Sequence, residues 1–288
     1  MKLILLLLSP LIIYAQSLSL QILGSGGPEF SERASSSYLV WIDNKAKVLV
    51  DAGGGAFLRF SQSPAKIEDL EFMALTHLHI DHSADLPAFM KAGYFSQRSK
   101  ALPILGTVSG GDFPDMEEYL QRMFGKHGAY AYMQDILTPQ SDSFELKPFV
   151  CDTDFKTQQF NNITLSSVGV KHGKIPAIAY SIEVEGKKIV FAGDTSAESD
   201  KLIKLAQNAD YLIVHHAIPQ HAGNYAKQLH ITPKRIGEVA QKAKVKHLIL
   251  SHRMKRTYDS EAESLRLIKE HYLGDVIWAE DMMKIDIK

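Results

Sequence analysis

The sequence has 288 residues but only one cysteine, Cys151, and almost no net charge. A single cysteine excludes an internal disulfide and a zinc cage of several thiolates. The formal charge of −1 argues against a protein that binds nucleic acid by bulk positive charge, although a local basic face stays open. Hydrophobic residues at 45% and charged residues at 23% are typical of a globular protein. The 12 histidines are therefore the main reserve of metal ligands.

Long apolar runs are also scarce, and the N-terminus carries the clearest one. Met1 and Lys2 precede an apolar stretch that is interrupted by Ser9-Pro10 and ends at Ala15. A positive start, a short apolar stretch and a small residue at its end are typical of a secretory signal peptide. The stretch is shorter than the roughly 20 residues that a membrane span needs.

We therefore expect residues 1–15 to be a cleaved signal peptide and residues 16–288 to be one domain. The mature protein would be periplasmic or secreted, without stable membrane insertion after cleavage. An uncleaved anchor or a buried first strand is the alternative.

No low-complexity linker or repeat divides the rest of the chain. Apolar and β-branched runs predict strands, and amphipathic spacing predicts helices. Strands mixed with helices in this order favour one α/β domain with sheets buried between helix layers. The predicted strands are 19–24, 38–42, 47–51, 72–76, 103–106, 163–168, 179–184, 188–192, 211–215 and 247–251, and the predicted helices are 83–94, 115–124, 233–243 and 260–272.

A histidine-rich stretch follows the predicted strand 72–76. It gives four candidate ligands, His77, His79, Asp81 and His82. Two histidines at alternate positions project the same way from an extended chain, and the next pair can reach a second point nearby. Imidazole and carboxylate suit zinc, and two metals about 3.5–4 Å apart are a known catalytic arrangement. A solvated histidine-rich loop is the alternative.

Three further candidate ligands follow other predicted strands. His172 lies past strand 163–168, Asp194 past strand 188–192, and His252 directly after strand 247–251. Taken singly, each is more often an ordinary polar strand terminus. Because active-site groups concentrate where strand ends meet loops, we expect all three to join the histidine-rich stretch.

Together these motifs resemble those of the metallo-β-lactamase-fold hydrolases, and within them the ribonuclease Z-like branch. The resemblance covers most of the mature sequence, including 23–28 (LGSGGP), 50–53 (VDAG), 76–82 (THLHIDH), 193–195 (GDT), 230–232 (HIT) and 250–252 (LSH). It implies an α/β fold that is a four-layer αββα sandwich, with two mixed β-sheets flanked by helices.

The resemblance also implies a cofactor of two zinc ions, with manganese or iron as alternatives. In the pattern of the family, one ion would be held by His77, His79 and His172. The other would be held by Asp81, His82 and His252, and Asp194 would bridge the two.

The implied catalytic residues are Asp81 and His230. His230 lies where a histidine of the branch assists phosphodiester cleavage, and a capping or surface histidine is the alternative. The branch usually has His-Glu where this chain has His215-His216, so the part that each of these two plays stays open. The remaining histidines are expected at the surface: His127, His221, His247 and His271.

Four other features need interpretation. Arg253, Lys255 and Arg256 either attract an anionic substrate or form a solvated face. The glycines of stretch 24–27 are read as a structural turn rather than a phosphate cradle, and Asp51 is read as ordering the metal loop from behind. The aromatic residues of stretch 112–137 either wall a pocket or pack in the core: Tyr119, Phe124, Tyr130 and Tyr132.

We expect an exported dinuclear zinc hydrolase that cleaves a small anionic ester, a phosphodiester first, by metal-activated hydroxide. The alternatives are hydrolysis of a lactone or aryl sulfate ester, or a non-hydrolytic metal-binding accessory protein. Stretch 112–137 lacks the long glycine- and lysine-rich arm of tRNA-processing members, which, with export, argues against a tRNA partner. A homodimer is the assembly that the resemblance suggests.

Overall fold

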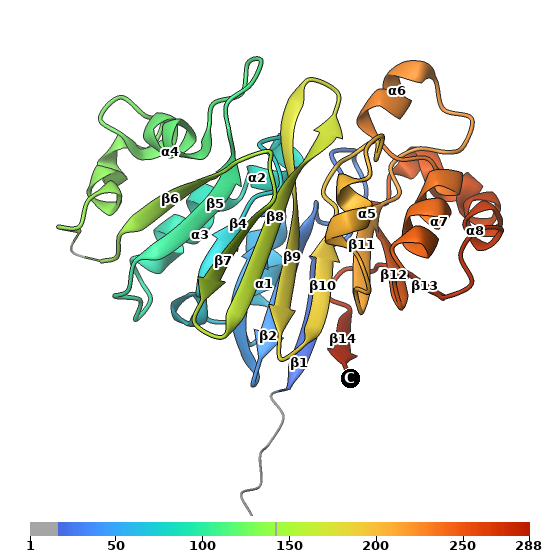
Figure 1. The fold of residues 1–288 in the computed structure, drawn as a ribbon. Coiled ribbons are helices and arrows are strands. Elements are labelled where there is room, and N and C mark those ends of the chain that lie inside the picture. Colours follow the sequence, from blue (N-terminus) through green and yellow to red (C-terminus); the bar gives the residue numbers. More distant parts are fainter. Residues whose placement is uncertain (1–16, 142) are drawn as a thin grey trace, which may run out of the picture.

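In the computed structural model, which describes residues 17–141 and 143–288, the strands form two sheets of seven (Figure 1). The first sheet has the order β14-β1-β2-β3-β4-β5-β6 and is parallel from β3 to β6 and antiparallel elsewhere. Its strands are β1 (Leu18–Gly24), β2 (Ser37–Ile42), β3 (Lys45–Val50), β4 (Phe72–Ala74), β5 (Leu102–Thr107), β6 (Leu146–Cys151) and β14 (Lys284–Ile287).

The second sheet has the order β13-β12-β11-β10-β9-β8-β7. It is parallel from β10 to β13 and antiparallel from β7 to β10. Its strands are β7 (Lys156–Phe160), β8 (Ile163–His172), β9 (Ile175–Val184), β10 (Lys187–Phe191), β11 (Tyr211–His215), β12 (His247–Ser251) and β13 (Asp275–Trp278).

Helices cover the outer faces of both sheets. The α-helices are α1 (Ala56–Ser61), α2 (Ile80–Ser83), α3 (Leu86–Gly93), α4 (Met116–Phe124), α5 (Lys201–Leu205), α6 (Asn224–Leu229), α7 (Pro233–Lys242) and α8 (Glu261–Lys269). Three short 3-10 helices are η1 (Ile67–Asp69), η2 (Ala131–Leu137) and η3 (Lys255–Ser260). In Figure 1, α3 and α4 lie at one side of the molecule and α7 and α8 at the other.

Three apolar clusters separate these layers. One fills the space between the sheets and includes Tyr180 and Phe191. A second joins the first sheet to α1, α3 and α4, with Phe89 against the strands. A third joins the second sheet to α5, α7 and α8. The predicted four-layer αββα sandwich is therefore confirmed.

The central strands show why the sequence builds this sandwich. Every residue of β11 is buried, because the strand has a sheet on one side and helices on the other. Tyr211 and Ile213 belong to the cluster between the sheets, whereas Leu212 and Val214 belong to the cluster under the helices. A continuous apolar run of this kind is typical of a parallel strand that is covered on both faces.

Some predicted elements are wrong in detail. The helix predicted over 83–94 is α3, which starts three residues later with Pro87 in its first turn, and the short helix α2 before it was not predicted. Four strands were not predicted, β6, β7, β13 and β14. The sequence KTQQF of β7 has no apolar alternation, and this strand lies at the edge of its sheet.

The predicted signal peptide, residues 1–15, lies outside the described residues. Within the part of the chain that the structure describes, no helix is both long and apolar enough to cross a bilayer.

Candidate metal centre

The side chains predicted as ligands meet at one edge of the sandwich. The histidine-rich stretch follows β4 and runs into α2, and the other three candidate ligands lie at or just beyond the ends of β8, β10 and β12. In Figure 1 this is the upper edge, where α2 and the hairpin of β8 and β9 lie. The parallel pairing of β10, β11 and β12 brings their carboxyl ends to the same edge.

One group of donor atoms contains three histidines and one carboxylate. The Nδ1 atom of His79 lies 3.0 Å from Nε2 of His77 and 3.4 Å from Nε2 of His172. Oδ2 of Asp194 lies 3.9 Å from Nε2 of His77 and 3.6 Å from Nε2 of His172. His77 and His172 are buried, and His79 is partly exposed.

A second group shares the same carboxylate through its other oxygen. Oδ1 of Asp194 lies 3.8 Å from Nε2 of His82 and 3.6 Å from Nε2 of His252. Oδ2 of Asp81 closes the group, 3.5 Å from Nε2 of His82 and 3.0 Å from Nε2 of His252. The structure thus brings all seven predicted ligands together.

These distances fit metal coordination. Donors about 2.0–2.2 Å from a tetrahedral ion lie roughly 3.3–3.6 Å from one another. The distances within the two groups, 3.0–3.9 Å, lie around this value. Buried Nε2 of His82 has no hydrogen-bond partner among the described residues, although burying such an atom unpaired is costly. A cation at the centre of each group would satisfy it and its neighbours, so the residues fit the metals that the fold implies.

The far sides of the imidazoles are held by residues behind the centre. Nδ1 of His82 lies 2.8 Å from Oδ2 of Asp51, and Nδ1 of His172 lies 2.7 Å from the carbonyl oxygen of Leu229. Asp51 also accepts hydrogen bonds from the backbone and hydroxyl of Thr76, at 2.7 and 3.0 Å. Such partners fix the tautomer and the direction of a metal-binding imidazole. Asp51 therefore orients His82 and the start of the histidine-rich stretch 76–82, as predicted.

The backbone around His252 is also constrained. His252 has φ +52, a left-handed conformation that costs a non-glycine residue about 1–3 kcal/mol. A Cβ at Gly27 would lie 2.5 Å from Cε1 of His252, so only glycine fits there. The loop that carries Gly27 is fastened by Asp281, which accepts from the backbone N–H of Ser25 at 3.0 Å and of Ala34 at 2.8 Å. The glycine-rich stretch is thus a structural turn against the site.

The structure separates the two histidines whose roles the sequence left open. Nδ1 of His215 hydrogen-bonds to Oδ1 of Asp194, and its ring stacks on that of His252 at 4.6 Å. Since the carboxylate can only accept, His215 Nδ1 carries the proton and holds Asp194 in place. His216 points away and packs edge-on against Trp278 at 5.0 Å, with neither ring nitrogen partnered among the described residues.

His230 lies beside the shared carboxylate. Its Nδ1 atom is 3.7 Å from Oδ2 of Asp194, and its ring lies 5.4 Å from that of His172. The side chain is 13% exposed, and Nδ1 is buried without a hydrogen-bond partner among the described residues. The predicted position next to the donor groups is what the structure shows; a catalytic role stays a prediction.

The protonation states differ between the groups. Burial lowers the pKa of His77, His79 and His172, so these imidazoles are neutral and ready to bind metal. Burial also acts on His82, but the carboxylates of Asp51, Asp81 and Asp194 outweigh it and raise the pKa of His82 to about 9. Burial opposes ionisation of Asp194, yet His252, His215 and His82 hold its pKa well below the usual range.

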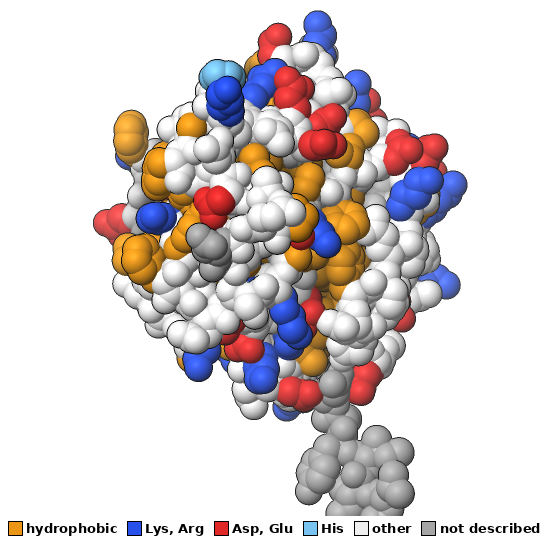
Figure 2. Space-filling model, turned by 90° about the vertical axis from the view of Figure 1, so that its left-hand side faces the viewer, with side chains coloured by type: hydrophobic (Ala, Val, Ile, Leu, Met, Phe, Trp, Pro, Cys, Tyr) orange, Lys and Arg blue, Asp and Glu red, His pale blue; other side chains and the backbone are white. Residues whose placement is uncertain are grey.

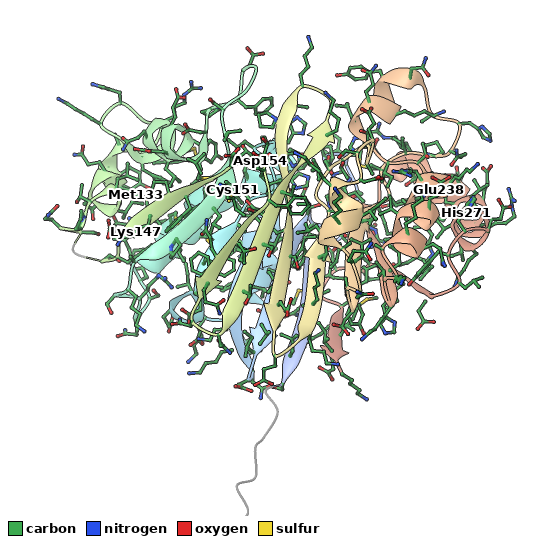
Figure 3. The ribbon with its side chains drawn as sticks, in the orientation of Figure 1. Met133, Lys147, Cys151, Asp154, Glu238 and His271 are labelled. Carbon is green, nitrogen blue, oxygen red and sulfur yellow. The ribbon has the colours of Figure 1, made fainter. Side chains whose placement is uncertain are left out.

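The histidines beside the donor groups are neutral as well. Burial lowers the pKa of His230 to about 3, and that of His215 and His216 to about 4. The other four histidines lie away from the centre: His127 and His221 are exposed, and His247 and His271 are partly exposed. Figure 3 shows His271 at the outer helical side of the molecule.

The basic residues after His252 are mostly neutralised by carboxylates. Arg253 bonds to Glu261 at 2.8 Å and to Glu280, and only 9% of it is exposed. Arg256 bonds to Glu29 at 2.7 Å. Of these three basic residues, Lys255 alone forms no ion pair within the described residues. The reading of this segment as an attractor of anions is therefore not supported for the two arginines.

Stretch 112–137 mostly packs rather than walls a pocket. Phe124 is fully buried and Tyr119 packs beside it, whereas Tyr130 and Tyr132 are 37% and 69% exposed. Figure 2 views the molecule from the side of α4 and shows apolar side chains there among charges of both signs. Sequence reasoning missed a contact of this stretch with the site: the ring of Phe113 lies 5.5 Å from that of His79.

Comparison with known proteins agrees with this geometry. Residues 46–253 match the family described as "Beta-lactamase superfamily domain", and the chain belongs to that superfamily. The ribonuclease Z of Mycobacterium bovis (strain BCG) is 26% identical over 285 residues, with 94% of this chain and 98% of the relative covered.

Two solved structures show the same fold. The metallo-beta-lactamase fold protein YhfI from Bacillus subtilis has a TM-score of 0.75 at 20% identity, with 94% of this chain and 100% of that chain covered. The short form of human tRNase Z has a TM-score of 0.71 at 20% identity, with 94% and 99% covered. The resemblance to ribonuclease Z-like metal-dependent hydrolases is confirmed. That the seven residues bind metal, and that the metal is zinc, stay predictions.

Proposed function

We propose that this protein is an exported dinuclear metal hydrolase that cleaves a small anionic ester, a phosphodiester first. The observation that carries the proposal is the division of one carboxylate between two donor groups, with Oδ2 of Asp194 in one and Oδ1 in the other. Superfamily membership and the relatives named ribonuclease Z support hydrolysis at such a centre. The signal-like residues 1–15 support export.

The bound ions, zinc in our proposal, would lower the pKa of a water toward about 7 and neutralise charge on the substrate oxygen. His77, His79 and His172 would hold one ion, and Asp81, His82 and His252 the other. Asp194 bridges the two groups, and its negative charge with that of Asp81 limits the net positive charge of the centre.

Asp81 and His230 are the residues that would handle protons. Surrounding histidines hold the pKa of Asp81 below its usual range, so its carboxylate is ionised and would accept a hydrogen bond that orients the attacking water. His230 is neutral, and its unpartnered Nδ1 lies at the edge of the centre. It would therefore donate an N–H hydrogen bond to the leaving oxygen as negative charge develops there, rather than act as a permanently charged acid.

The test combines metal analysis with a substrate panel. Purified protein should contain two equivalents of zinc and hydrolyse bis(p-nitrophenyl) phosphate faster than aryl sulfates or lactones. His230→Ala should keep its metal and lose roughly 10²–10⁴ in turnover, whereas His221→Ala, at an exposed position, serves as the matched control. A metal-replete protein that is inert toward the whole panel would refute the proposal.

Processing of tRNA is a second candidate, favoured by relatives whose names are ribonuclease Z and by the likeness to human tRNase Z. These relatives do not fit our expectation of a chain without a tRNA partner. The packed arrangement of stretch 112–137, in place of an extended arm, favours the smaller substrate. Cleavage of a precursor tRNA at a higher kcat/KM than any small phosphodiester would decide for the second candidate.

A further inference from the structure

A cavity of about 610 Å³ lies beside the metal centre. It sits between the turn that joins β8 to β9 and helix α6, which adjoin each other at the upper edge in Figure 1. The residues that line it are Lys171, Gly173, Lys174, Ile175, Glu198, Tyr225, Gln228 and Leu229.

Two backbone connections join this cavity to the centre. His172 lies between the lining residues Lys171 and Gly173, and Leu229 directly precedes His230. Nδ1 of His172 bonds to the carbonyl of Leu229 at 2.7 Å, and the N–H of Gly173 donates to the carbonyl of Gln228 at 3.0 Å. The wall of the cavity on this side is therefore built by neighbours of a metal ligand and of His230.

The cavity is lined by two lysines and one carboxylate and so carries net positive charge. Lys171 and Lys174 are exposed, and neither ammonium group forms an ion pair or hydrogen bond with the residues that the structure describes. Glu198 is the one carboxylate among the lining residues. A second cavity of about 610 Å³ is different, because its Arg33 is bonded to Glu280 and it also contains Glu32 and Asp281. An anionic ligand is therefore favoured in the first cavity.

An aromatic surface faces the same space. Tyr225 is 77% exposed and makes no ring contact or hydrogen bond within the described chain. Helix α6, which carries it, has no buried residue, so its side chains are free to contact a ligand. Exposed aromatic rings next to cations are the usual way in which proteins bind a base or another aromatic ring without reading its hydrogen bonds.

We propose that this cavity is the subsite for the ring-bearing part of the substrate, an aryl group or nucleobase attached to the anionic ester that the metal centre cleaves. The proposal rests on the proposed function. Tyr225 stacks on the ring of the substrate. Lys171 and Lys174 attract the negative charge of the ester, which keeps the attached ring in the cavity. The volume lies within the roughly 300–1,000 Å³ of small-molecule sites.

The test measures binding of three probes by ligand-observed NMR: phenyl phosphate, adenosine 5′-monophosphate and methyl phosphate, which has no ring. Tyr225→Ala should weaken both ring-bearing probes by about tenfold, as loss of a stacking aromatic does, and leave methyl phosphate unchanged. Tyr225→Phe should bind like the original protein. Lys174→Ala should weaken all three probes, and Lys227→Ala, on α6 but outside the cavity, should weaken none.

Metal content is measured on every variant and should be unchanged. Equal affinity of Tyr225→Ala and the original protein for the ring-bearing probes would overturn the proposal. So would an equal loss for methyl phosphate, since the residue would then act on the centre rather than on the ring. A preference between the adenosine and phenyl probes distinguishes a nucleobase from a simple aryl group.

The two proposals fail separately. Ring-dependent binding that is lost in Tyr225→Ala, in a protein that hydrolyses no phosphate ester, retains the subsite and refutes the phosphodiesterase function. Hydrolysis of phosphodiesters with the same KM for aryl and alkyl esters retains the phosphodiesterase function and refutes the subsite.

Discussion

The raised pKa of His82 predicts that the two metal-binding groups respond differently to pH. Imidazole binds metal only when it is neutral, so a protonated ligand must lose its proton first. With a pKa of about 9, about one His82 in a hundred is neutral at pH 7. Affinity of the group containing His82 should therefore rise at least about tenfold from pH 7 to pH 8 and at least about fiftyfold from pH 7 to pH 9, because the pKa of His252 in the same group is raised as well.

The other group should show no such rise. Burial lowers the pKa of His77, His79 and His172, so all three are neutral throughout this range. Competition with a zinc-buffering chelator at pH 7, 8 and 9 should resolve one pH-dependent and one pH-independent equivalent. Calorimetry in buffers of different ionisation enthalpy should count about one proton released by the pH-dependent equivalent at pH 7.

A matched variant isolates the cause. Asp51→Asn keeps a hydrogen-bond acceptor for Nδ1 of His82, at the position now 2.8 Å away, but removes a negative charge that raises the pKa of His82. Its affinity should be higher at pH 7 relative to pH 9 than in the original protein. Two equivalents of equal pH dependence, or no change of slope in Asp51→Asn, would refute the reasoning.

Three further predictions concern stability and metal content. Tyr38→Phe removes the buried 2.8 Å hydrogen bond to Oγ of Ser251 and should lower the free energy of unfolding by about 1–3 kcal/mol in urea titrations; an unchanged midpoint would contradict it. Gly53→Ala places a Cβ 2.1 Å from the carbonyl oxygen of Asp81 and should reduce bound zinc, measured by mass spectrometry, with full occupancy as the contrary result. His216→Phe should raise the free energy of unfolding by about 2 kcal/mol more at pH 5 than at pH 8. Burial lowers the pKa of His216 to about 4 in the folded protein, whereas the unfolded chain binds this proton below about pH 6.5, so the histidine destabilises the fold at pH 5. Equal gains at both pH values would contradict this.

Local signals predicted the α/β class and the candidate ligands, whereas the four-layer sandwich was predicted from the resemblance to a known family. Apolar runs marked most core strands, and polar residues at the ends of those strands marked the site. The edge strand β7 was missed because a strand with one neighbour and solvent contact needs no apolar alternation. Helix α2 was missed because it is only four residues long and lies within the histidine-rich stretch, where no apolar spacing marks a helix.

Other features depend on contacts between distant segments. His215 and His216 are adjacent and chemically identical, yet one holds Asp194 and the other packs on Trp278, because the strand end directs them to opposite sides. The neutralisation of Arg253 requires Glu261 and Glu280, which the local sequence does not associate with it. The contact of Phe113 with His79 likewise joins two segments that no motif connects.

The hydrogen bonds of Asp281 give the C-terminal segment influence over chemistry that it never touches. This carboxylate fastens both ends of the loop whose Gly27 leaves room for the ring of His252. The segment that carries Asp281 must therefore be in place before this loop is fixed, and β14, which follows it, pairs with β1. Loss of the Asp281 carboxylate would release the loop and, with it, the close packing of Gly27 against His252.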